Sequence, residues 1–214
     1  MAAPRTVVIG AGAIGAFVAA RLTLAGRPCA VVARGATLRA LTDGPLRLLD
    51  DGREVEVPLR AVPDPADAGP VELAIVCTKG FDTEAAARAL APALATDSVV
   101  LSFQNGVDNP ALIARECPGA TVGGVAVYLG CQRTAPDRVV RRPSRDPSTG
   151  RLRDRFAGGG PGAAGAALRA VAEACGVTAD IEERPELALW TKLVANASLN
   201  TVTALGRRAP GRAR

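Results

Sequence analysis

Short, nearly continuous apolar runs alternate with longer segments typical of helices over most of the chain. Apolar runs of this kind predict strands that are buried on both faces, as in parallel sheets. The predicted strands cover residues 5–10, 30–33, 72–77, 98–103 and 121–129, and the predicted helices cover residues 13–25, 82–95 and 109–116. The alternation favours an α/β fold with a Rossmann-type, doubly wound parallel sheet.

Three stretches interrupt this pattern. Residues 46–50 and 54–59 flank Asp50-Asp51-Gly52, a turn sequence that predicts a β-hairpin. Residues 63–70 contain three prolines and predict a loop. Residues 133–155 are rich in arginine and broken by proline, which predicts another hairpin with a loose loop around residues 143–149.

The C-terminal part begins a different architecture. Its first predicted elements are a flexible turn at 158–162, a helix over 163–175 and a short strand over 177–181. Pro185 then opens a helix that extends to about Leu205, because proline is well placed in a first helical turn. The basic tail, residues 206–214, predicts no regular structure. We therefore expect an α/β domain at 1–182 and the start of an all-α domain at 183–214.

The first predicted strand is followed by Gly10-Ala11-Gly12-Ala13-Ile14-Gly15, a G-x-G-x-x-G motif that opens a helix. Such a motif is informative only between a strand and a helix, which is its context here. The glycines permit a tight turn, a close approach of a diphosphate, and close helix–strand packing. The alternative is an ordinary turn in a chain rich in alanine and glycine. The motif predicts a dinucleotide-binding loop formed by Gly10, Ala11, Gly12, Ala13, Ile14 and Gly15.

Arg34 stands at the end of the second predicted strand, between Ala33 and Gly35. Sites for NAD usually carry an acidic residue at this point, whereas a cation suits the 2′-phosphate of NADP. Arginine is abundant in this chain, so Arg34 could also be an ordinary surface residue. We predict NADP(H) as the cofactor.

Lysine occurs only at Lys79 and Lys192, although Lys and Arg together number 26. Unlike arginine, a buried lysine can lose its proton near neutral pH, so it can act in proton transfer. Lys192, Asn196 and Asn200 are spaced by four residues and therefore share one face of the predicted C-terminal helix. A polar, solvated stripe is the alternative interpretation.

Two further motifs end predicted strands: Thr78-Lys79-Gly80 and Gln104-Asn105-Gly106. Ligands of open α/β sheets bind outside the carboxyl ends of the strands, so both motifs are expected to face the crevice of the glycine loop. Either could instead be a plain turn. We therefore expect Lys79, Gln104 and Asn105 to lie in this crevice, where a cofactor would bind.

Taken together, five motifs resemble those of the ketopantoate reductases (2-dehydropantoate 2-reductases). They are V-V-I-G-A-G-A-I-G at 7–15, Arg34, C-T-K-G at 77–80, Q-N-G at 104–106, and K-L-V-A-N-A-S-L-N at 192–200. The resemblance implies NADPH-dependent reduction of 2-dehydropantoate to (R)-pantoate in pantothenate and coenzyme A biosynthesis. The related β-hydroxyacid dehydrogenases carry a glycine where this chain has Ala188, which favours the ketopantoate branch.

The resemblance also implies residue roles. Lys192 would be the catalytic proton donor, and Asn196 and Asn200 would bind the substrate. Asn105 would contact both cofactor and substrate, and Lys79 would lie on the nicotinamide side. Family members continue into a longer helical domain that adds substrate contacts, so the domain at 183–214 is expected to be incomplete.

Composition narrows the alternatives. Histidine is absent, which removes the commonest metal ligand and general base, so no metal site or Ser-His-Asp triad is expected. The five scattered cysteines favour a reducing cytoplasm. The net charge is +5, but no aromatic residues accompany the arginines, so a nucleic-acid partner is not expected. No apolar run is long enough to predict a membrane-spanning helix.

The expected partner is a small keto acid, and a homodimer is a further expectation. Two other functions remain open at this point: a non-catalytic NADP-binding module, and a reductase of another 2-keto acid.

Overall fold

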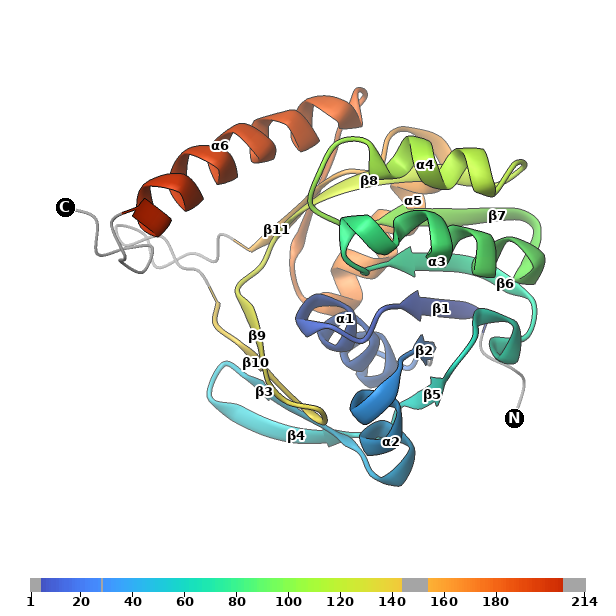
Figure 1. The fold of residues 1–214 in the computed structure, drawn as a ribbon, viewed down its shortest axis with the longest axis vertical. Helices are drawn as coiled ribbons and strands as arrows, with labels where there is room; N and C mark the ends of the chain where they lie inside the picture. The colour runs from blue at the N-terminus through green and yellow to red at the C-terminus, as the bar shows by residue number, and fades with distance from the viewer. Residues whose placement is uncertain (1–4, 28, 144–153, 206–214) are drawn as a thin grey trace.

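The computed structural model describes residues 5–27, 29–143 and 154–205, except for the side chains of residues 199–205. The predicted loose loop at 143–149 and the basic tail at 206–214 therefore lie almost entirely outside the described residues. The structure has a large eight-stranded sheet, a smaller four-stranded sheet and six α-helices within the described ranges (Figure 1).

The large sheet has the strand order β12-β11-β8-β7-β6-β1-β2-β5. Its strands are β1 (Thr6–Ile9), β2 (Ala30–Val32), β5 (Arg60–Val62), β6 (Val71–Val76), β7 (Leu94–Ser102), β8 (Thr121–Tyr128), β11 (Arg155–Gly158) and β12 (Thr178–Ile181). The six neighbouring strands β8-β7-β6-β1-β2-β5 are all parallel, which confirms the predicted sheet. β11 pairs antiparallel with β8, so the sheet is mixed at that edge.

Helices cover both faces of this sheet. They are α1 (Ala13–Leu24), α2 (Gly35–Asp43), α3 (Thr83–Leu90), α4 (Asn109–Glu116), α5 (Gly162–Cys175) and α6 (Pro185–Leu205). Alternate residues of β1 enter different cores: Val8 packs on the side of α1 and α5, whereas Val7 and Ile9 pack on the side of α3 and α4. This division explains why residues 7–9 of β1 are all apolar.

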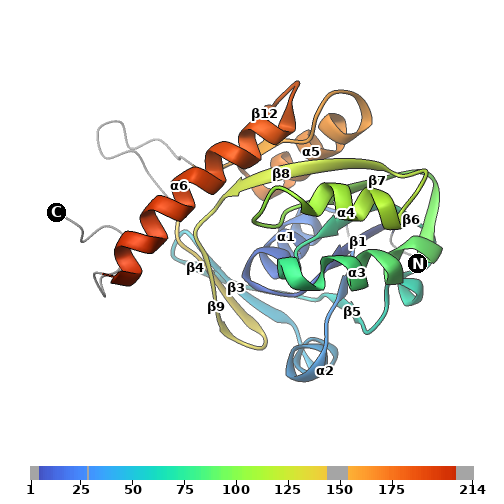
Figure 2. The same ribbon diagram turned by 45° about the horizontal axis from the view of Figure 1, so that its top comes forward.

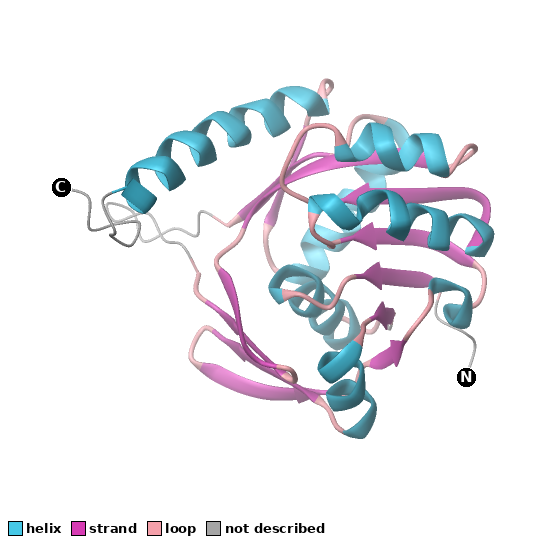
Figure 3. Ribbon diagram, in the orientation of Figure 1, coloured by secondary structure: helices cyan, strands magenta, loops and turns pink. Residues whose placement is uncertain are grey.

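The first predicted hairpin forms. A hairpin also forms in the predicted region 133–155, but it turns at Pro136 and Asp137 rather than around residues 143–149. The second sheet arises from the union of the two hairpins. The first consists of β3 (Leu46–Asp50) and β4 (Arg53–Val57), and the second of β9 (Cys131–Ala135) and β10 (Arg138–Arg141). β10 lies parallel to β3, which gives the order β4-β3-β10-β9. Figure 3 shows this sheet apart from the large sheet, with α1 between the two.

The position of α1 explains its composition. It contacts strands of both sheets and also α5. Phe17, Val18, Ala19 and Ala20 are all fully buried, so the helix has no polar face. A helix that is apolar all round is expected only where packing surrounds it. The second sheet therefore completes the core around the helix that begins at the glycine loop (Figure 2).

Some local predictions were wrong. The helix expected over 82–95 ends at Leu90, because Pro92 cannot donate a helical hydrogen bond and clashes with the preceding turn. A short 3₁₀ turn then leads into β7, which begins at Leu94 rather than at residue 98. The helix α2 and the strand β5 were not predicted. The turn expected at 158–162 begins within β11.

A buried ion-pair network joins the two sheets. The Arg141 side chain on β10 is 6% exposed and donates to Asp154 from Nε at 3.1 Å and from Nη2 at 2.9 Å. Its Nη1 also donates to Asp50 on β3 at 3.3 Å. Buried charges of this kind are tolerated only when they are paired.

Across the described residues, no helix has the length and apolarity needed to cross a membrane.

Candidate cofactor-binding and catalytic site

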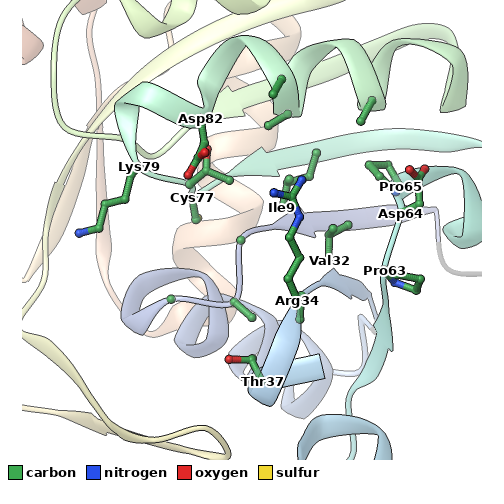
Figure 4. A pocket seen from close by; sticks show the side chains of 18 of the residues that line it. Ile9, Val32, Arg34, Thr37, Pro63, Asp64, Pro65, Cys77, Lys79 and Asp82 are labelled. Carbon is green, nitrogen blue, oxygen red and sulfur yellow. The ribbon is translucent and has the colours of Figure 1, made fainter. Parts of the chain in front are cut away.

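A cavity of about 270 Å³ lies at the carboxyl ends of β1, β2 and β6 (Figure 4). Predicted cofactor residues contribute Gly10, Ala11, Gly12, Arg34 and Lys79 to its lining. These residues come from three separate strand ends, which the parallel sheet brings to one edge.

The glycine loop has the geometry that its motif predicts. Gly10 adopts φ +101°, and a Cβ there would lie 3.0 Å from the backbone of Cys77 and Thr78. A Cβ on Gly15 would clash with the carbonyl oxygen of Gly10, so the helix can lie against the loop only with glycine at that position. Around Gly12 there is open space, with nothing within 4 Å of a Cβ.

The amino end of α1 is suited to an anion. Gly12 is its N-cap and supplies no side chain to satisfy the first N–H groups, and the first turn has no acidic residue. Free N–H groups and the helix dipole both favour a phosphate there. Ala13, Ile14 and Gly15 belong to this first turn and are not among the residues that line the cavity.

Arg34 lines the cavity from the start of α2. It caps α2 in an extended conformation, with φ −136° and ψ 161°, and its exposed side chain extends into the cavity (Figure 4). Thr37, one turn later, also lines the cavity. α2 has no side-chain cap and no acidic residue in its first turn, so its amino end offers further N–H groups beside Arg34.

Lys79 follows β6 and is exposed. Its side chain lines the cavity and extends away from Arg34 (Figure 4). The two cations therefore stand well apart along the lining of the cavity. This spacing suits a long ligand that carries negative charge at more than one point.

Gln104 does not lie where it was predicted. It is buried and does not line the cavity. Its Nε2 donates to the hydroxyl of Thr78 at 3.0 Å and to that of Thr83 at 2.8 Å, and its Oε1 accepts from Ser102 at 3.1 Å. Both ends of the amide are thus used within the protein. Gln104 fixes the ends of β6 and β7 relative to α3 instead of facing a ligand.

Asn105 is exposed at the end of β7, outside the lining of the cavity. Its carbonyl oxygen accepts from Asn109 Nδ2 at 2.9 Å, and Asn109 Oδ1 in turn accepts from Thr83 Oγ1 at 2.9 Å. The backbone of Asn105 is therefore fixed, while its exposed side chain can meet a ligand. Thr83 and Asn109, both buried, were missed by the sequence analysis, although polar residues at helix starts were the available signal.

Lys192 is positioned by the packing of α6 on β8. Leu189 is buried, and a Cβ on Gly124 would lie 2.8 Å from its Cδ1, so the glycine permits the close approach of the helix. Three residues later, Lys192 Nζ donates to the carbonyl oxygen of Val127 at 2.6 Å. The ammonium also lies 5.6 Å from the centre of the Tyr128 ring. Lys192 therefore stands at the carboxyl end of β8.

Burial lowers the pKa of Lys192 from 10.5 to about 8. The desolvated ammonium remains mostly charged at neutral pH but releases its proton more readily than an exposed lysine. A lysine of this kind can serve as a general acid. Asn196 is half-buried one turn further along α6. The backbone of Asn200 continues the helix, but its side chain lies outside the described residues.

Arg133 also lines the cavity, beside the glycine loop, and was not predicted from the sequence. The arginine-rich pattern around it predicted only a loose hairpin, and nothing local indicated that the hairpin folds over the loop.

Most of these residues lie in a region that matches a known protein family. The sequence profile described as ketopantoate reductase PanE/ApbA matches residues 6–152, which include the glycine loop, Arg34, Lys79 and Asn105. The chain belongs to the ketopantoate reductase family. The resemblance identified from the sequence motifs is thereby confirmed.

Individual relatives agree with this assignment. The 2-dehydropantoate 2-reductase of Halobacterium salinarum is 32% identical over 209 residues, covering 94% of this chain and 65% of that protein. The 2-dehydropantoate 2-reductase of Archaeoglobus fulgidus is 33% identical over 207 residues, covering 97% and 66%. A crystal structure of a PanE/ApbA family ketopantoate reductase from Ralstonia eutropha JMP134 superposes with a TM-score of 0.81 at 31% identity, covering 94% of this chain and 64% of that one. The chain thus spans slightly less than two thirds of each.

Proposed function

We propose that this protein catalyses the NADPH-dependent reduction of 2-dehydropantoate to (R)-pantoate. The single observation that carries the proposal is Lys192, a desolvated ammonium held against Val127 at the sheet edge that also bears the glycine loop. The relatives named 2-dehydropantoate 2-reductase support the choice of substrate. The proposal places the reaction in pantothenate and coenzyme A synthesis in the cytoplasm.

The described residues fit a dinucleotide. The open space at Gly12 and the uncapped start of α1 suit the diphosphate, and Arg34 with the start of α2 suits a 2′-phosphate. Between them, Ala85, Ala86 and Ala89 of α3 line one wall of the cavity. Their small side chains leave room for a flat ring such as adenine, so NADP(H) remains our predicted cofactor.

The chemistry required of the chain is limited. When bound, the nicotinamide supplies the hydride. Lys192 must supply a proton to the alkoxide oxygen that develops on the substrate. The ammonium has three N–H groups, of which the bond to Val127 uses one, so two remain for substrate oxygens. Asn196 and Asn105 are our candidates for orienting the substrate, together with Asn200.

The experiment is NADPH oxidation with 2-dehydropantoate, followed by absorbance, in the wild type and in Lys192→Met. Turnover should be lost in the variant while NADPH binding persists. Lys192→Arg should also be impaired, because a guanidinium does not release its proton. Glu186→Gln, an exposed change in the first turn of the same helix, serves as the matched control.

Different outcomes separate the alternatives. Normal NADPH binding without turnover in the wild type would leave a cofactor-binding module. Faster turnover of another 2-keto acid would reassign the substrate. Full activity in Lys192→Met would refute the role of the lysine. Whether the protein forms a homodimer stays a prediction, to be measured by light scattering.

A further inference from the structure

Arg133 extends from the second sheet to the glycine loop. Its guanidinium donates from Nη1 to the carbonyl oxygen of Ala11, and it lines the same cavity as Gly10 and Gly12. Two more bonds fix its orientation, from Nε to Ala135 at 3.1 Å and from Nη2 to Pro136. The β9–β10 hairpin therefore delivers a cation to the loop at which the diphosphate is expected.

The electrostatic situation of Arg133 differs from that of its neighbours. Among the described residues, Arg47 pairs with Asp137, Arg138 with Glu54, and Arg141 with Asp154. Arg133 has only carbonyl oxygens as acceptors in the part of the chain that the structure describes. The acidic residue that attracts the Arg133 guanidinium electrostatically is Asp137. Its carboxylate already accepts a bidentate pair of hydrogen bonds from Arg47, at 3.0 and 3.1 Å.

This arrangement costs free energy in the absence of an anion. Partial burial lowers the pKa of the Arg133 guanidinium, because desolvation outweighs the attraction of Asp137. A half-buried charge without an anionic partner is unfavourable unless a ligand supplies that partner. A guanidinium has five N–H groups, and the three contacts above use three of them. Two N–H groups therefore remain available beside the cavity.

We infer that Arg133 is a diphosphate-binding residue of the dinucleotide site, acting from the opposite sheet to the helix amino end. The inference rests on the proposed use of NADPH, but not on the identity of the keto acid. It assigns a function to the second sheet: the hairpin completes an anion site that the glycine loop provides on one side only. Charge-assisted bonds from Arg133 would add to those from the α1 N–H groups.

The test compares two ligands in direct binding titrations with Arg133→Met and Arg133→Lys. NADPH contains the diphosphate, whereas adenosine 2′-phosphate contains the adenine and the 2′-phosphate without it. Arg133→Met should weaken NADPH binding by about tenfold or more, since it removes charge-assisted hydrogen bonds to the diphosphate. The affinity for adenosine 2′-phosphate should stay unchanged. The NADPH affinity of Arg133→Lys should lie between those of wild type and Arg133→Met, because lysine keeps the positive charge but lacks the paired N–H donors of the planar guanidinium.

The matched control is Arg138→Met, which removes a cation from the same hairpin outside the cavity and should leave both affinities unchanged. Equal NADPH affinity in wild type and Arg133→Met would overturn the inference. So would an equal loss for both ligands, because that result would mean that Arg133 only supports the shape of the loop.

Failure of the wild type to bind NADPH would overturn the inference together with the proposed cofactor. Normal NADPH binding without ketopantoate turnover would refute the proposed function alone.

Discussion

The protonation of Lys192 offers the sharpest test of the site. The perturbation is a change of pH from 6 to 10, applied to the wild type and to Lys192→Arg. Burial lowers the pKa from 10.5 to about 8, which corresponds to a penalty of about 3 kcal/mol on the charged form. With that pKa, the ammonium is about nine tenths protonated at pH 7 and about one tenth protonated at pH 9.

Two measurements follow from this value. The turnover number for ketopantoate reduction should fall about tenfold per pH unit above pH 8, because only the protonated amine can act as the acid. Lys192→Arg should be less active and should lack this descending limb. Since the chain has only two lysines, NMR of labelled lysine side chains should show two signals, and Lys79→Arg identifies which belongs to Lys192.

The pH dependence of stability independently checks the direction in which burial shifts the pKa of Lys192. The unfolded chain keeps the lysine proton to higher pH than the folded protein does. Lys192 should therefore raise the free energy of unfolding as the pH increases from about 8 to 10.5. A Lys192 signal that titrates near 10.5, or a turnover number that stays flat through pH 9, would refute the argument that burial by α6 and β8 prepares the proton donor.

Three further predictions concern other parts of the molecule. Arg34→Asp should weaken NADPH binding by about tenfold or more and favour NADH, because a carboxylate would face the 2′-phosphate; paired titrations with both cofactors measure this, and an unchanged preference would contradict it. Gly15→Ala should lower the melting temperature and abolish cofactor binding, because the new Cβ would clash with the carbonyl oxygen of Gly10; a wild-type melting curve would show that the helix can shift at little cost. Asp154→Asn should cost about 3–5 kcal/mol of unfolding free energy in urea titrations, since it leaves Arg141 buried beside a neutral amide; a loss below about 1 kcal/mol would mean that Asp50 alone compensates the charge.

The candidate site was only partly predictable, because each motif indicates a residue type at a strand end but not its surroundings. Gly10, Gly12 and Arg34 line the cavity as expected, since a strand–loop–helix unit places them by local geometry. Gln104 looked equivalent to its neighbour Asn105, yet it is buried among the hydroxyls of Thr78 and Thr83. Which of two adjacent polar residues faces inward depends on partners that are 21 and 26 positions away in the chain.

The sequence by itself determined the elements whose causes are local. The apolar strands, the G-x-G-x-x-G turn, the turn at Asp51 and Gly52, and the helix opened by Pro185 follow from hydrophobic patterning and backbone preferences over a few residues. The spacing of Lys192 and Asn196 on one helical face is likewise a local property.

Only the tertiary structure decided how these elements meet. Strand β10 pairs with β3, with Arg138 opposite Arg47 in the register, and this joins two hairpins that are about ninety positions apart. No local pattern encodes a contact over that separation. That pairing surrounds α1 and delivers Arg133 to the glycine loop. The pKa of Lys192 has the same origin, because its desolvation depends on α6 packing against β8 through Gly124. Residue types are set by sequence, but burial and charge environment arise from contacts between distant segments.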